Sequence, residues 1–137
     1  MAHFRQVDHC VLGIPALDRD HVRLAKLLTR MLSPRWSTGV SQLIRTCVDD
    51  LVPHLAHHFN REEMLMRLVG YPYAAQHRQS HAVLLARLSE FQTLLRRNAF
   101  PHDQLHDFLA GALLSHLREE DMKLKPWVDR LERSTAA

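Results

Sequence analysis

The chain has 137 residues, of which 46% are apolar and 24% charged, and its formal net charge is +3. This composition is typical of one soluble domain with a substantial core. No stretch approaches the roughly 20 apolar residues that span a bilayer. The start MAHFRQVDHC lacks the apolar segment of a signal peptide, so we expect a cytoplasmic protein with no membrane partner. Acidic and basic residues are interleaved, which argues against nucleic acid as a partner. Cys10 and Cys47 form no CxxC pattern, so we expect reduced thiols.

Apolar residues recur every three or four positions almost throughout the chain, which predicts an all-α fold. We expect an irregular arm over residues 1–14, followed by a first helix that opens at Pro15 and stops at Ser33–Pro34. A second helix should be capped within Ser37–Thr38 and end at Gly70.

Pro72 can sit in the first turn of a third helix, which should end near Asn98. Pro101 should open a fourth helix that ends around residues 117–119, and a short tail helix should cover about residues 125–133. Long amphipathic helices with short connections favour an antiparallel up-down four-helix bundle. The predicted single domain comprises an arm (1–14), a bundle (about 15–119) and a tail (120–137).

Histidine is far above its ordinary usage, with eleven in the chain. His58 and Glu62 are four residues apart in the second helix, and His77 and His81 have the same spacing in the third. Each pair therefore lies on one helix face. A carboxylate that faces an apolar core without compensation is very costly. A bound metal ion is the simplest compensation.

The first and fourth helices each add a histidine on their apolar side, His21 and His116. Asp121 follows His116 by five residues, which is a poor same-face spacing in a regular α-helix. It can join the others only where the helix ends or unwinds. Seven candidate ligands thus come from all four helices: His21, His58, Glu62, His77, His81, His116 and Asp121.

Four motifs together resemble the hemerythrin family, and specifically its single-domain bacterial members. They are D-x-x-H at Asp18–His21, H-F-x-x-E-E-x-L-M at His58–Met66, Y-P-x-x-x-x-H-x-x-x-H at Tyr71–His81, and H-x-x-x-x-D at His116–Asp121. The resemblance implies a non-haem centre of two iron ions (Fe2+/Fe3+) bridged by oxide or hydroxide. It also implies the role of each ligand: His77, His81 and His116 on one iron, His21 and His58 on the other, and Glu62 and Asp121 as bridges.

Such a ligand set leaves one coordination position open, on the iron with two histidines, as in a ligand-binding rather than a closed structural site. The expected walls of its pocket are apolar: Leu24, Phe59, Leu113 and Leu117. A dry pocket disfavours charged products and so slows autoxidation. The resemblance therefore implies a protein that binds dioxygen reversibly for storage, delivery or buffering, and not an enzyme.

Two other classes of function stay open. One is a module that senses oxygen, nitric oxide or redox state and reports to a protein partner, although no fused signalling domain is evident. The other is an enzyme, such as a peroxidase or a nitric-oxide-consuming protein. The sequence contains neither the E-x-x-H pairs of ferritin-like di-iron proteins nor the H-E-x-x-H of zinc proteases. We expect a monomer.

Three positions depart from the family pattern. Phe4 is the nearest aromatic residue in the arm, where the family often has Trp, and Leu124 stands where it often has Tyr. Pro53 is unusual in the middle of the second helix and predicts a kink just before His58. His54 shares the helix face of His58, but the family pattern favours His58 as the ligand.

Overall fold

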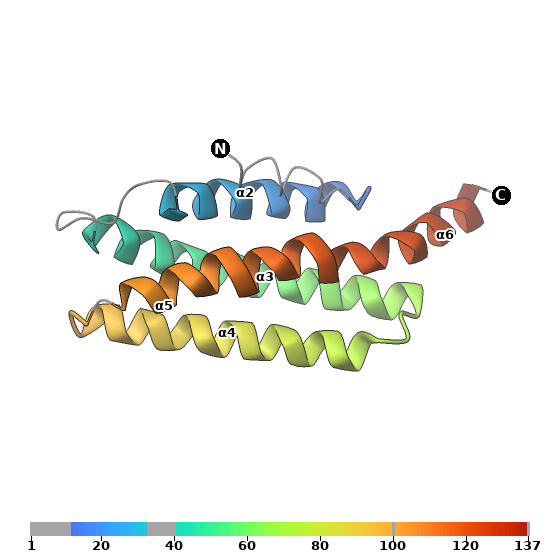
Figure 1. Cartoon of the computed structure of the whole chain (residues 1–137). Helices are drawn as coiled ribbons and strands as arrows, with labels where there is room; N and C mark the ends of the chain where they lie inside the picture. Colours follow the sequence, from blue (N-terminus) through green and yellow to red (C-terminus); the bar gives the residue numbers. More distant parts are fainter. Residues whose placement is uncertain (1–11, 33–40, 100, 137) are drawn as a thin grey trace.

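The computed structural model describes residues 12–32, 41–99 and 101–136. Three helical rods come first: α2 (Pro15–Leu32), α3 (Ser41–Val69) and α4 (Ala74–Arg96). The fourth rod consists of α5 (His102–Asp107), η1 (Phe108–Leu113), η2 (His116–Glu120), η3 (Asp121–Leu124) and α6 (Lys125–Ala136). Consecutive rods run in opposite directions, and α3 packs against both α2 and α4 (Figure 1). The predicted antiparallel four-helix bundle is confirmed.

The ends of α3 and α4 follow from residues that tolerate a left-handed backbone. Gly70 has a φ of 68°, and the N–H of Tyr71 donates to the carbonyl oxygen of Met66 at 2.9 Å. This bond closes the last turn of α3 in a Schellman motif. Asn98, with a φ of 60°, has the same place after α4. Both predicted stops are confirmed, whereas Phe4, Cys10 and the predicted cap within Ser37–Thr38 lie outside the described residues.

The fourth rod does not end around residues 117–119, so this part of the prediction was wrong. The chain stays helical from α5 to α6, but its winding changes: η1 and η2 are π-helical and η3 is a 3-10 turn. In η2 the N–H of Asp121 donates to the carbonyl oxygen of His116, five residues back. The wider π turn places residues five apart near one another on the same side of the rod. The unwinding that Asp121 requires therefore occurs inside a continuous helical rod.

The apolar core is divided into two layers with a buried polar layer between them. The larger apolar layer fills most of the bundle, and the smaller one lies where α6 begins. On three rods a polar residue separates the two layers: His21 between Leu17 and Leu24, Glu62 between Phe59 and Leu65, and Asp121 between Leu117 and Leu124. Apolar side chains on both sides therefore shield the candidate ligands from water.

Two other predictions concern α3. The helix runs through Pro53 without interruption, and the Pro53 side chain is exposed. The kink predicted just before His58 stays a prediction. Cys47 is a free thiol in the core, as expected. Among the helices that the structure describes, none has the length and apolarity needed to cross a membrane.

Candidate metal centre

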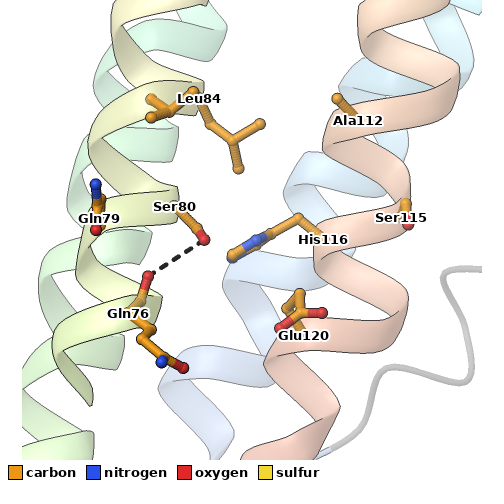
Figure 2. A pocket seen from close by; sticks show the side chains of 9 residues that line it. Gln76, Gln79, Ser80, Leu84, Ala112, Ser115, His116 and Glu120 are labelled. Atoms are coloured by element: carbon orange, nitrogen blue, oxygen red, sulfur yellow. Dashed lines mark hydrogen bonds between the residues drawn. The ribbon is translucent and has the colours of Figure 1, made fainter. Parts of the chain in front are cut away.

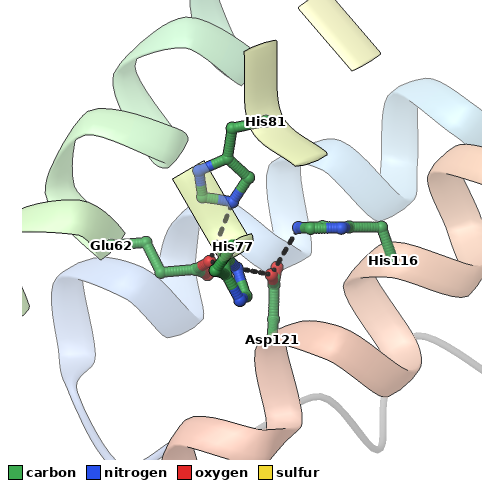
Figure 3. A group of neighbouring side chains, drawn as sticks. All are labelled: Glu62, His77, His81, His116 and Asp121. Carbon is green, nitrogen blue, oxygen red and sulfur yellow. Dashed lines mark hydrogen bonds and ion pairs between the residues drawn. The ribbon is translucent and has the colours of Figure 1, made fainter. Parts of the chain in front are cut away.

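The structure brings the seven predicted ligand residues into one buried cluster, five of which are shown in Figure 3. Their ligand atoms form two groups in which all atoms lie within 4.8 Å of one another. One group contains three histidines (His77, His81 and His116), and the other contains two (His21 and His58). Glu62 and Asp121 belong to both groups.

The two oxygens of Glu62 face different groups of histidines. Oε1 lies 2.6 Å from Nε2 of His77 and 3.1 Å from Nε2 of His81. Oε2 lies 3.3 Å from Nε2 of His58. One carboxylate on α3 thus contacts both groups.

Asp121 is divided in the same way. Its Oδ1 lies 2.9 Å from Nε2 of His116 and 3.2 Å from Nε2 of His77. Its Oδ2 lies 3.3 Å from Nε2 of His58 and 3.5 Å from Nε2 of His21. Each carboxylate therefore offers one oxygen to each group of histidines, which is the arrangement that a ligand shared by two cations requires.

The cluster is not satisfied by its own hydrogen bonds. Within the described part of the chain, Oε2 of Glu62 and Nε2 of His116 are buried, and their close contacts to His58 and Asp121 do not have the geometry of hydrogen bonds. A buried polar atom left unpaired costs roughly 1–3 kcal/mol. Cations bound between the imidazole nitrogens and the carboxylate oxygens would satisfy these atoms, and imidazole with carboxylate is a donor set that suits iron. The residues therefore fit a metal pair.

Comparison with known proteins identifies the family. The Hemerythrin HHE cation binding domain matches residues 12–128. The chain belongs to the hemerythrin family. It is 28% identical to a bacteriohemerythrin of Stenotrophomonas maltophilia over 83% of this chain and 74% of that protein. A bacteriohemerythrin of Pseudomonas paraeruginosa is 27% identical over 88% of this chain and 78% of its own length.

A solved structure supports the fold of this hemerythrin-family chain. The crystal structure of a hemerythrin mutant superposes with a TM-score of 0.73, at 20% identity, and the match covers 85% of this chain and 89% of the other. The resemblance inferred from the four motifs is therefore confirmed. The protein is a hemerythrin-family metal-binding protein with a buried histidine and carboxylate cluster.

Without a metal, two histidines in the cluster of this hemerythrin-family chain, His58 and His77, are protonated near neutral pH. Burial lowers the pKa of His58, but its hydrogen bond to Asp121 and the nearby Glu62 carboxylate outweigh burial and raise that pKa to about 10. The same balance raises the pKa of His77 to about 9. Burial acts to raise the pKa of Asp121, yet the surrounding imidazoles hold it well below its ordinary range. In the metal-free cluster His58 and His77 are thus imidazoliums beside the Asp121 carboxylate.

Metal uptake is expected to release protons and to become tighter as pH rises from about 6 to about 8. A ligating imidazole must be neutral, and the pKa values of His58 and His77 lie above this range. Each proton that must be displaced weakens binding by about 1.4 kcal/mol for every pH unit below the pKa. Titration calorimetry with Co2+ in two buffers of different ionisation enthalpy measures the released protons. Uptake with no proton release at about pH 7 would contradict this charge state.

Two acidic residues outside the predicted set contact its histidines. Nδ1 of His81 donates to Oε2 of Glu63 at 2.9 Å, which fixes the ring so that Nε2 faces Glu62. Oδ2 of Asp20 lies 3.5 Å from Nδ1 of His58, and both oxygens of Asp20 accept hydrogen bonds from Arg61. The sequence shows these acids beside predicted ligands, but it does not reveal their partners on other helices.

The predicted pocket residues all belong to the larger apolar layer. Leu24, Phe59, Leu113 and Leu117 are all fully buried. The Phe59 ring stacks on His81 with 3.8 Å between centroids, and its centroid lies 6.0 Å from that of His58. His54, by contrast, is exposed, in agreement with the choice of His58 as the candidate ligand.

Proposed function

We propose that this chain holds two iron ions in the cluster and binds dioxygen reversibly at one of them. The proposed ligands are His77, His81 and His116 on one ion, His21 and His58 on the other, and Glu62 and Asp121 as bridges. The observation that supports this proposal most is the division of both carboxylates between a group of three histidines and a group of two. With only two histidines, the smaller group would leave one coordination position of its ion open.

The chain's own residues suit a carrier. When bound, the iron pair supplies the electrons and the open coordination position that dioxygen binding requires. Leu24 and Phe59 are buried in the larger apolar layer, and the Phe59 ring lies against the cluster, 3.8 Å from the ring of His81 and 6.0 Å from that of His58, where it helps to exclude water. A dry surrounding disfavours the escape of charged oxygen species, which would leave the iron oxidised. We propose storage, delivery or buffering of dioxygen in the cytoplasm by a monomer, without enzymatic turnover.

The proposal is tested by loading the protein with Fe2+ anaerobically and admitting oxygen. We expect two irons per chain and a near-ultraviolet and visible charge-transfer band that disappears when oxygen is removed. His58→Ala should lose the band, whereas His54→Ala, one turn earlier on the same helix and exposed, should keep it. A colourless protein with one zinc, or steady turnover of peroxide or nitric oxide without a reversible band, would contradict the proposal.

A further inference from the structure

Two adjoining hollows lie along the seam between α4 and the fourth rod. Their volumes are about 440 Å³ and about 580 Å³, and Gln76, Ser80 and Glu120 line both of them. Figure 2 shows the first hollow, with His116 extending from the fourth rod toward Ser80 on α4. We refer to the two hollows together as the polar groove.

The polar groove reaches the three-histidine group from outside. His116 lines the first hollow and His77 lines the second. Each of these histidines is 5% exposed, whereas the other five cluster residues are between 0% and 2% exposed. The cluster is therefore closest to solvent at the floor of the polar groove.

The groove offers the oxygen donors that a divalent cation prefers. The carboxylate of Glu120, the amide of Gln76 and the hydroxyl of Ser80 share its lining, and such oxygens replace the water ligands of a cation in stages. At about 30 Å³ for each water, a cation with six waters occupies on the order of 200 Å³. Either hollow is large enough to admit it.

The exposed charged side chains that line the polar groove, Glu120 and Lys123, form an ion pair. Nζ of Lys123 donates to the two oxygens of Glu120 at 3.1 Å and 3.2 Å. Lys123 thus competes with any cation for the Glu120 carboxylate. Both side chains are substantially exposed, at 58% for Lys123 and 45% for Glu120, so the pair is weak enough for a dication to replace it.

We propose that the polar groove is the route by which a hydrated divalent cation reaches the three-histidine group, with Glu120 as its first protein ligand. The next residue in the chain is Asp121, whose Oδ1 faces His116 and His77 inside the bundle. A cation at Glu120 therefore passes to a carboxylate that already belongs to the cluster. This inference rests on the proposed metal centre, because the route needs a destination.

The test measures by stopped-flow absorbance how fast the metal-free 137-residue chain takes up Co2+. Removing the attracting charge in Glu120→Gln should slow loading by about three-fold to ten-fold, and removing the repelling charge in Lys123→Met should accelerate it by a similar factor. Glu119→Gln is the matched control, because Glu119 is the exposed neighbour and does not line the groove. All three variants should reach the final cobalt content of the wild type.

A second variant tests the groove itself. Ser80 is exposed on α4 and lines both hollows, so Ser80→Trp should obstruct the groove and slow loading while the helical circular dichroism is unchanged. Wild-type loading rates in Glu120→Gln, Lys123→Met and Ser80→Trp would overturn the route. A wild-type chain that never takes up two ions would instead overturn the metal centre, so the two failures are distinguishable.

Discussion

Replacing Glu62 by glutamine is expected to reduce the metal content from two ions per chain to one or none. Glu62 offers one oxygen to His77 and His81 and the other to His58, so both groups lose a ligand together. The neutral amide also fails to balance the charge of two buried cations. Affinity for the pair should fall by more than about 100-fold, which exceeds the roughly 10-fold to 100-fold loss typical of residues that only support a ligand. Equilibrium dialysis with elemental analysis measures the content.

Glu63 provides the matched control for this substitution. It is adjacent in sequence and accepts a hydrogen bond from His81, but it belongs to neither ligand group. Glu63→Gln should therefore bind both ions at saturating metal, with affinity lowered by about 10-fold to 100-fold. If Glu62→Gln also retains two ions at saturation, Glu62 does not bridge them.

Replacing Phe59 by alanine should both lower the stability of the fold and accelerate autoxidation of the iron-loaded protein. Phe59 is fully buried and stacks on His81, so truncation leaves a cavity beside the cluster. Such a change lowers the free energy of unfolding by about 3–5 kcal/mol, a large fraction of the 5–15 kcal/mol typical of a domain. Water in the cavity should also accelerate autoxidation. The urea midpoint and the decay of the oxygen band measure the two effects on the iron-loaded protein.

Phe91→Ala is the control that separates the effect of lost core packing from the effect of lost protection against autoxidation. Phe91 is as deeply buried as Phe59, but its ring packs on Phe108 at 5.5 Å in the larger apolar layer. Phe91→Ala should lower stability by a similar amount and leave the autoxidation rate close to that of the wild type. If both variants autoxidise equally fast, Phe59 acts only through packing.

Most of the bundle could be predicted because its determinants are local. The three-and-four periodicity predicted the helices, and Gly70 and Asn98 predicted the ends of α3 and α4 because each adopts a left-handed backbone there. Four-residue spacing placed His77 and His81 on one face of α4, where the structure has them buried together. These relations depend only on the geometry of a single helix.

The fourth rod could be predicted only in part. The five-residue interval between His116 and Asp121 required an unwound turn, but the sequence did not distinguish a helix end from a π turn. The structure has the π turn, and the rod continues into α6. Burial of Asp121 among four histidines of other turns and rods accompanies this winding, and such long-range contacts have no signature in the local sequence.

Contacts between helices were also beyond prediction from the sequence. Glu63 contacts His81 across the α3–α4 interface, and Asp20 contacts both His58 and Arg61 across the α2–α3 interface. Their partners depend on how the helices are rotated against one another, which apolar periodicity fixes only approximately. The polar groove has the same origin, because its lining comes from two rods that are distant in sequence.

Anomalous diffraction at the iron edge from crystals of the loaded protein tests the central claim most directly. We predict two iron peaks roughly 3.5–4 Å apart, as in other two-metal sites. One peak should lie among His77, His81 and His116, and the other beside His21 and His58, with Glu62 and Asp121 each bonded to both. A single peak, or two peaks that do not share these carboxylates, would contradict the account.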